Sequence, residues 1–442
     1  MDMAFLGDLL TSVADRGRAL IGFERFAGRN RPIAQLCEDL LSGRGEASGM
    51  ALAQAVLDAW ERLDKAGRQG FFAMLQERFG PDHDRLGKAI DAYRAEPSAA
   101  NIAALHPASE PRRQELLRRL NLAPGGTHVL VRMRESLFEA MEASPELAAV
   151  DGDFRHLFGS WFNRGFLVLR RIDWRTPANV LEKIIRYEAV HEIQGWDDLR
   201  RRLEPADRRC FAFFHPQLID EPLIFVEVAL TGEIPRSIGE VLSGEREVLP
   251  AQAASTAVFY SISNCQEGLR GISFGNFLIK QVAEDLKREL PNLDTFVTLS
   301  PLPGFARWLS ATVEEPGDFR MTNEERAELA RSPGEAVSLD EATRARRDRL
   351  LGQMAAQYLL RARTASGRVI DPVARFHLGT GARLERINVG AHLPAPGLRE
   401  SHGVMVNYRY DLDEIEINHE AFATRNTVVA NSSVRKLLRP AA

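Results

Sequence analysis

The first part of the chain shows the apolar spacing of amphipathic helices. Up to about residue 160, apolar side chains recur every three or four positions, as in residues 52–60 and 71–79. Proline and glycine pairs interrupt the pattern at intervals, as helix ends require. Runs that alternate between apolar and polar residues are rare. The pattern therefore predicts an all-helical N-terminal domain over residues 1–160.

From about residue 161 the pattern changes to short apolar runs that are typical of strands. Such runs lie at residues 210–214, 223–230, 257–263, 295–299 and 383–389. Thr176 followed by Pro177 predicts a helix start, with threonine as the N-cap. Between residues 318 and 365 the pattern is helical again, and Ser338 with Glu341 predicts a capping box. We therefore expect a mixed α/β domain over residues 161–442 that contains a helical insertion.

Composition limits the classes of protein to be considered. A length of 442 residues favours at least two domains, and 45% hydrophobic with 27% charged residues is typical of a soluble globular protein. The net charge of -4 gives no reason to expect a nucleic-acid partner. No apolar run approaches the roughly 20 residues that span a bilayer, so no membrane association is expected. Three scattered cysteines fit a reducing compartment, and we expect a cytoplasmic protein.

A glycine-bearing loop separates the run at residues 257–263 from a helix predicted over residues 276–290. Its glycines stand at positions 268, 271 and 275. A glycine loop between a strand and a helix N-terminus favours phosphate binding, because unpaired N–H groups and the helix dipole both attract anions. The spacing matches neither the dinucleotide fingerprint nor the P-loop. A tight connection without a ligand is the alternative.

The same loop contains the pattern Gly-x-Ser-x-Gly at residues 271–275, which is the nucleophile elbow of α/β-hydrolases. In that fold the serine directly follows a strand, whereas residues 264–270 separate Ser273 from the nearest strand-like run. No oxyanion segment is recognisable upstream. A hydrolase or thioesterase based on Ser273 is therefore the weaker hypothesis.

Two other side chains are candidates for catalysis. Ser300 ends a predicted strand and precedes the rigid Pro-Leu-Pro-Gly segment at residues 301–304, which would fix its position. His377 lies among apolar residues, and its imidazole exchanges protons near neutral pH. His215 has similar surroundings, so spacing does not choose between the two histidines. The chain has no His-Glu-x-x-His motif and no paired Cys-x-x-Cys motif, so no metal site is predicted.

Several segments, in order, resemble the malonyl-CoA decarboxylase family. Together they extend over at least residues 160–410. The chain departs from the family pattern at Ser273 and at residues 400–403. The matching segments are residues 221–224, 228–232, 259–263, 268–271, 277–280, Leu299-Ser300-Pro301-x-Pro303-Gly304-Phe305, residues 371–378, 386–388 and Asn407-Tyr408-Arg409-Tyr410.

This resemblance implies a helical N-terminal domain used in homo-oligomer contacts, giving a dimer or tetramer. It also implies a catalytic domain with the fold of GCN5-related N-acetyltransferases (the GNAT fold). The implied reaction converts malonyl-CoA to acetyl-CoA and CO₂ without a metal or an organic cofactor. The family's catalytic serine and histidine correspond to Ser300 and His377, and we expect His377 to supply the proton.

The resemblance also implies where CoA binds. Ser300 is expected to bind the malonyl carboxylate or to hold His377. Asn388 and Tyr408 are expected to orient the carboxylate. The related fold leaves open an acyl-CoA-dependent acyltransferase or a non-catalytic CoA-binding scaffold. The residues expected to bind CoA are Gly268, Arg270, Gly271, Gly275 and Asn276.

Overall fold

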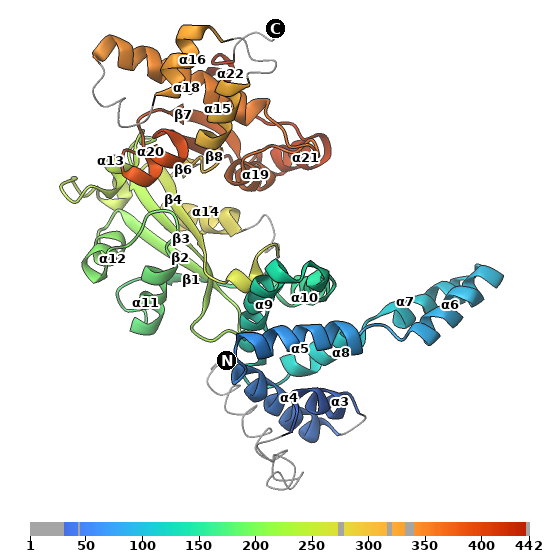
Figure 1. The fold of residues 1–442 in the computed structure, drawn as a ribbon. Helices are drawn as coiled ribbons and strands as arrows, with labels where there is room; N and C mark the ends of the chain where they lie inside the picture. The colour runs from blue at the N-terminus through green and yellow to red at the C-terminus, as the bar shows by residue number, and fades with distance from the viewer. Residues whose placement is uncertain (1–30, 43–44, 273–277, 316–320, 332–339, 439–442) are drawn as a thin grey trace. The chain divides into compact units, whose positions relative to one another are not determined.

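The described part of the chain forms two compact units, each built from segments that are far apart in the sequence (Figure 1). The first comprises Met1–Val168, Phe214–Leu223 and Gln266–Phe274. The second comprises Leu169–Phe213, Ile224–Cys265 and Gly275–Ala442. The computed structural model describes residues 31–42, 45–272, 278–315, 321–331 and 340–438 of the 442.

The first unit consists mainly of helices, as the apolar spacing predicts. In α4 the side chains of Leu52, Val56 and Trp60 share one buried face. Helix α9 packs against α4, α5, α8 and α10. The helices are α3 (Ile33–Leu41), α4 (Glu46–Glu61), α5 (Lys65–Arg78), α6 (His83–Ala95), α7 (Ala99–Ser109), α8 (Arg112–Asn121), α9 (Gly126–Ala143) and α10 (Ala148–Trp161), with 3₁₀ turns η1 (Pro145–Leu147), η2 (Arg164–Phe166) and η4 (Glu267–Leu269).

The second unit is organised around an eight-stranded mixed sheet. The strand order is β1-β2-β3-β4-β5-β8-β6, and β7 also pairs with β8. Strands β4 and β5 are parallel, whereas β8 is antiparallel to β5, β6 and β7. The strands are β1 (Val168–Ile172), β2 (Arg208–Phe214), β3 (Pro222–Thr231), β4 (Thr256–Asn264), β5 (Thr295–Thr298), β6 (Ser300–Pro301), β7 (Arg383–Asn388) and β8 (Met405–Tyr410).

The helices of this part of the chain connect successive strands of the sheet or follow its last strand, β8 (Figure 1). Among the described residues no helix is both long enough and apolar enough to cross a membrane. The helices are α11 (Ala178–Tyr187), α12 (Trp196–Leu203), α13 (Ile238–Leu242), η3 (Ala251–Ala253), α14 (Leu278–Glu289), α15 (Phe305–Glu314), α16 (Asn323–Ala330), α18 (Glu341–Leu360), α19 (Pro372–Gly379), α20 (Ala395–Ser401), α21 (Ile415–Arg425) and α22 (Ser432–Arg435).

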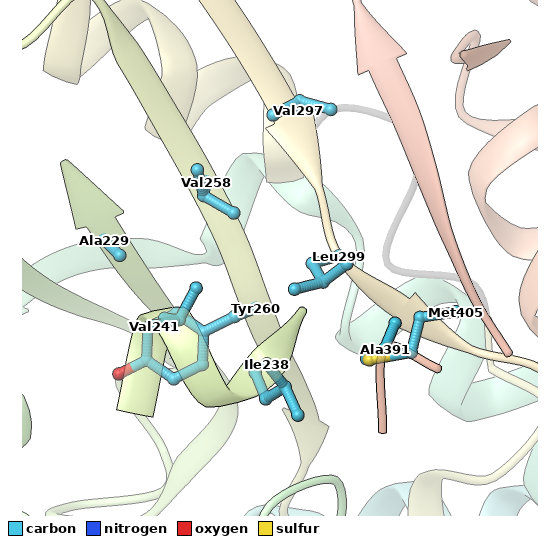
Figure 2. Packing of buried hydrophobic residues seen from close by; sticks show 9 residues of the cluster. All are labelled: Ala229, Ile238, Val241, Val258, Tyr260, Val297, Leu299, Ala391 and Met405. Atoms are coloured by element: carbon cyan, nitrogen blue, oxygen red, sulfur yellow. The ribbon is translucent and has the colours of Figure 1, made fainter. Parts of the chain in front are cut away.

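One face of the central strands is sealed by an apolar cluster (Figure 2). Val258 and Tyr260 of β4 pack there with Ile238 and Val241 of α13. Full burial of a Val, Leu or Ile side chain stabilises a fold by about 1.5–3 kcal/mol. The cluster therefore fixes β4 from one side and leaves its other face for a different use. Its remaining members are Ala229, Val297, Leu299, Ala391 and Met405.

Two predicted helix starts differ from the structure. The helix expected to begin at Pro177 begins at Ala178, because the hydroxyl of Thr176 accepts a hydrogen bond from the Asp173 N–H at 3.0 Å and does not cap the helix. Helix α18 is capped by Asp340, whose carboxylate accepts from the Thr343 N–H at 3.0 Å. Ser338, the predicted capping residue, lies outside the described residues.

The predicted fold class is confirmed. A helical N-terminal region is followed by a mixed α/β domain, and α16 and α18 supply the predicted helical insertion. All five predicted strands are present within one or two residues of their expected bounds. Strands β1, β6 and β8 are present but were not predicted, and β8 proves to be central to the site.

Candidate active site

A cavity of about 290 Å³ lies in the second unit where β4 separates from its neighbour. The parallel pairing of β4 with β5 ends at Phe259 and Thr298, and the remainder of β4 lines the cavity. Among the described residues that line it, none is an aspartate, glutamate, lysine or arginine. The lining residues are Val190, Ile224, Val226, Phe259, Tyr260, Ile262, Asn264, Leu278, Ile279, Ser300, Pro301, Pro372, Val373, Phe376 and His377.

Ser300 reaches this cavity at an interruption between β5 and β6. At the interruption, Thr298 bonds to side chains and backbone of β8. Its hydroxyl accepts from the Tyr408 N–H at 3.2 Å, and its carbonyl oxygen accepts from the Asn407 amide at 2.8 Å. These bonds satisfy buried polar groups where the regular strand ladder is broken. They fix the backbone that carries Ser300.

His377 enters the cavity from α19. The carboxylate of Asp371 caps this helix by accepting from the Ala374 N–H at 2.8 Å, and Pro372 occupies the first turn. His377 is buried, with 3% of its surface exposed. Its Nε2 lies 3.0 Å from the Oγ of Ser300. The structure thus brings together the two predicted catalytic residues, which are far apart in the sequence.

Both imidazole nitrogens of His377 have hydrogen-bond partners. The hydroxyl of Ser300 donates to the Oγ1 of Thr298 at 2.9 Å. Because a hydroxyl has one hydrogen, this bond leaves the Oγ of Ser300 as an acceptor toward Nε2 of His377. Nδ1 lies 2.8 Å from the hydroxyl of Tyr410, which also contacts the hydroxyl of Thr380. This polarity is opposite to that of a serine nucleophile, which donates its hydrogen to the histidine.

Burial keeps the imidazole of His377 uncharged. Desolvation lowers its pKa from 6.5 to about 3. The ring of Tyr408 stacks on the imidazole, with centroids 4.7 Å apart and planes inclined by 24°. A carboxylate placed beside Nε2 would raise the pKa of His377, because an opposite charge favours the protonated form. The site can therefore take up a proton when an anionic ligand enters.

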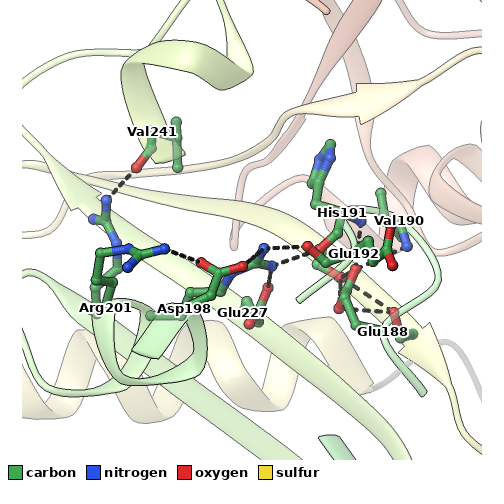
Figure 3. Close-up of polar contacts among 12 residues, drawn as sticks. Glu188, Val190, His191, Glu192, Asp198, Arg201, Glu227 and Val241 are labelled. Carbon is green, nitrogen blue, oxygen red and sulfur yellow. Dashed lines mark hydrogen bonds and ion pairs between the residues drawn. The ribbon is translucent and has the colours of Figure 1, made fainter. Parts of the chain in front are cut away.

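A polar clamp holds the backbone segment that carries Val190, one of the residues lining the cavity (Figure 3). The carboxylate of Glu188 accepts from the backbone N–H groups of Val190 at 2.9 Å and His191 at 2.7 Å. Arg202 holds the same segment from the other side by donating to the carbonyl oxygens of His191 at 2.8 Å and Glu192 at 3.0 Å. The clamp fixes the backbone at Val190, whose side chain lines the cavity.

The predicted phosphate loop belongs to the first unit. Gly268 lies against α9, where an added Cβ would stand 2.0 Å from the carbonyl oxygen of Val131. Its N–H donates to the carboxylate of Glu135 at 3.4 Å. Gly271 has a φ of +77° and a solvent-exposed position. Arg270 is exposed, forms a 2.6 Å ion pair with Glu267, and its role in binding CoA stays a prediction.

The other predicted site residues either are not among the residues that line the cavity or lie outside the described residues. Tyr408 contacts His377 by stacking, but it does not line the cavity. Asn388 is buried, and its amide donates to the Asn407 side chain at 2.7 Å. Their predicted role in orienting a carboxylate remains untested. Ser273, Gly275 and Asn276 lie outside the described residues.

Comparisons with known proteins address the family. Residues 79–162 match the model of the malonyl-CoA decarboxylase N-terminal domain, and residues 165–442 match that of the malonyl-CoA decarboxylase C-terminal domain. The mitochondrial malonyl-CoA decarboxylase of Mus musculus is 32% identical over 92% of this chain and 86% of its own length. This chain belongs to the malonyl-CoA decarboxylase family.

Solved malonyl-CoA decarboxylase structures agree closely with this fold. The enzyme from Rhodopseudomonas palustris is 56% identical with a TM-score of 0.86, covering 91% of this chain and 98% of its own. The enzyme from Agrobacterium vitis is 58% identical with a TM-score of 0.88, covering 92% and 100%. The family assigned from sequence motifs is thus confirmed, and it is a family of carboxy-lyases.

Sequence reasoning missed three polar residues that position the pair in this family member. Tyr410 bonds to Nδ1 of His377, Thr380 bonds to the Tyr410 hydroxyl at 2.8 Å, and Thr298 bonds to Ser300. A signal was available, since Tyr408 and Tyr410 are two residues apart and would share one face of a strand. The same spacing relates Thr298 to Ser300.

Metal-binding groups do not gather in the described part of this decarboxylase-family chain. Within it, no group of three or more His, Cys, Asp or Glu side chains could hold a metal ion. The cysteines at positions 37, 210 and 265 are buried. That the reaction needs neither a metal nor an organic cofactor stays a prediction.

Lowering the pH from 7 to 5 is expected to destabilise the folded chain through His377. Its pKa is lowered from 6.5 to about 3, so between these values the unfolded state binds a proton that the folded state does not. The free energy of unfolding therefore decreases as the pH decreases, and this residue accounts for a loss of about 2 kcal/mol between pH 7 and pH 5. Denaturant titrations of wild type and His377→Asn at both pH values measure the difference. Equal losses in the two proteins would contradict the expectation.

Proposed function

We propose that this chain is a malonyl-CoA decarboxylase that produces acetyl-CoA and CO₂. The observation that carries the proposal is the 3.0 Å contact between Ser300 and His377 at the wall of this cavity. Membership of the family supplies the reaction, and the resemblance assigns the family's catalytic serine and histidine to these two residues. The proposal assigns the chemistry to the second unit.

The reaction breaks the bond between the malonyl α-carbon and its carboxylate. The bonding electrons move into the thioester carbonyl and form an enolate, while CO₂ leaves. Negative charge thus moves from the carboxylate toward the thioester oxygen.

His377 then protonates the α-carbon. In the free protein the imidazole is neutral, because burial lowers its pKa to about 3. The substrate carboxylate raises that pKa, and the ring binds a second proton. Proton transfer to the enolate carbon yields acetyl-CoA and returns the imidazole to neutrality. One proton is consumed for each CO₂ released, which balances the reaction.

Ser300 orients the reacting carboxylate in this proposal and forms no acyl-enzyme. Its Oγ can turn from Thr298 to donate to a substrate oxygen while Nε2 of His377 remains 3.0 Å away. In this proposal Asn388 and Tyr408 help to orient the carboxylate. The glycine loop that includes Gly271 binds the CoA diphosphate through backbone N–H groups.

Mass spectrometry of purified protein mixed with malonyl-CoA alone tests the proposal. No acceptor, metal or organic cofactor is added. Enzyme-dependent formation of acetyl-CoA supports decarboxylation without these groups. Unchanged malonyl-CoA would favour an acyltransferase lacking its acceptor, or a CoA-binding scaffold. Free CoA with malonate would indicate a thioesterase, and a fluorophosphonate probe would then show whether Ser273 is its nucleophile.

We also propose that the helical region of residues 1–160 makes homo-oligomer contacts, giving a dimer or tetramer. Helix α6 has no buried residue, and Ile102 of α7 exposes 55% of its surface. Sedimentation velocity measures the assembly, and a monomer would contradict the proposal. Cytoplasmic location stays a prediction from the sequence, since the name of the mouse relative is qualified as mitochondrial.

A further inference from the structure

A buried guanidinium group connects helix α9 to the predicted phosphate loop. Arg134 exposes 1% of its surface. Its Nη1 donates to the carbonyl oxygens of Gly268 at 2.8 Å and Arg270 at 2.9 Å, and its Nε donates to Asp151 at 2.7 Å. All four residues belong to the first unit. Burial of a charge is costly unless it is paired in this way, so the arrangement holds the loop firmly.

These bonds determine how the loop presents its N–H groups. In a trans peptide the N–H points away from the carbonyl of the same unit. Because Arg134 binds the carbonyl oxygen of Arg270, the N–H of Gly271 is directed away from α9. Among the described residues, that N–H has no hydrogen-bond acceptor. The N–H of Gly268, by contrast, is taken by Glu135.

Gly271 also has the conformation that this presentation requires. Its φ of +77° lies in the left-handed region, which a residue with a Cβ rarely adopts. Phe138 supports the same turn, since the guanidinium groups of Arg134 and Arg270 lie 4.7 Å and 4.2 Å from its ring centroid. The loop is therefore held at its carbonyl groups and through the side chain of Arg270.

We infer that Arg134 is a positioning residue for CoA, which fixes the Arg270–Gly271 peptide so that the Gly271 N–H binds the diphosphate. The inference rests on the proposed function for the identity of the ligand. It assigns a role in substrate binding to a residue of the helical region. It also removes Gly268 from the predicted phosphate donors and gives it a packing role.

Replacing Arg134 by lysine tests this role. Lysine keeps the positive charge, but its single ammonium group lacks the planar fork that reaches both carbonyl oxygens and Asp151. Calorimetry should show Kd for CoA raised about tenfold, the loss expected for one charge-assisted hydrogen bond. Pantetheine lacks the diphosphate, so its affinity should be unchanged. In turnover, KM for malonyl-CoA should rise while kcat is retained.

The chain offers a matched control in Arg113. This arginine is also buried and paired with a buried carboxylate, that of Asp153. Its guanidinium otherwise donates, among the described residues, to the carbonyl oxygen of Ala149 and not to the loop. Arg113→Lys should lower stability and leave CoA affinity unchanged. An equal loss of CoA affinity in the two variants would overturn the inference, because it would indicate general loosening of the helices. So would weakened pantetheine binding, or normal CoA binding by Arg134→Lys.

A second variant keeps the inference testable if Arg134→Lys does not fold. Asp151→Asn leaves Arg134 in place but weakens its anchor, and it should raise Kd for CoA by a smaller factor with the same selectivity over pantetheine. Normal CoA affinity in this variant would overturn the inference if Arg134→Lys did not fold. Wild type that binds CoA yet forms no acetyl-CoA would refute the proposed function alone. Wild type that does not bind CoA would overturn both.

Discussion

Replacing His377 by asparagine is expected to lower kcat by about 10²–10⁴, the contribution of a general acid. Asparagine retains a side chain of similar polarity that can bond to Ser300 but cannot deliver a proton to carbon. The substrate contacts made elsewhere are unchanged, so affinity for CoA should be preserved. Steady-state kinetics with malonyl-CoA and calorimetry with CoA measure the two quantities.

His215 provides the control for this variant. It is buried like His377, with 6% of its surface exposed, but its ring bonds to the carbonyl oxygen of Trp161 at 3.1 Å and packs on Phe162. His215→Asn should lower stability and retain turnover. Near-full activity in His377→Asn would refute its role, as would a loss in His215→Asn that matched it.

Replacing Ser300 by alanine is expected to lower kcat by about 10², the loss typical of one oriented donor at a reacting oxygen. The hydroxyl donates to Thr298 and accepts from His377 in the free protein, so it is not prepared for nucleophilic attack. Intact-mass spectra recorded during wild-type turnover should therefore show no acyl adduct.

Ser401→Ala is the control, because that buried hydroxyl bonds only to the carbonyl oxygens of Gly397 and Val404 among the described residues. An adduct on Ser300, or full activity without it, would contradict the assignment.

Local patterns predicted most of the fold because they report burial along one element. The helical spacing before residue 160 and the apolar runs of β2 to β5 are signals of this kind. Strand β8 carries an asparagine, two tyrosines and an arginine, so its apolar pattern is weak. It is nevertheless a central strand, because β5, β6 and β7 all pair with it. Pairing partners of that kind are set by the whole sheet and cannot be read from one segment.

The candidate site was only partly accessible from sequence for the same reason. Ser300 and His377 were identified by resemblance to a family, since spacing alone did not separate His377 from His215. Tyr410 and Thr380 act through contacts across the fold, which no local pattern reports. Gly268 was predicted to bind phosphate, but α9 lies against it. The sequence shows a need for glycine and does not show whether a ligand or a helix creates that need.

The interleaving of the two units has a consequence for dissecting the protein. Residues 214–223 and 266–274 belong to the helical unit although they lie within the second half of the chain. A fragment beginning at residue 161 would lack Val131 and Arg134, and thus the surface on which the turn at Gly268 is seated. No single cut of the chain releases either unit complete. Limited proteolysis near residue 160 should consequently yield two pieces that remain associated, and the piece carrying Ser300 and His377 should not fold when it is made alone.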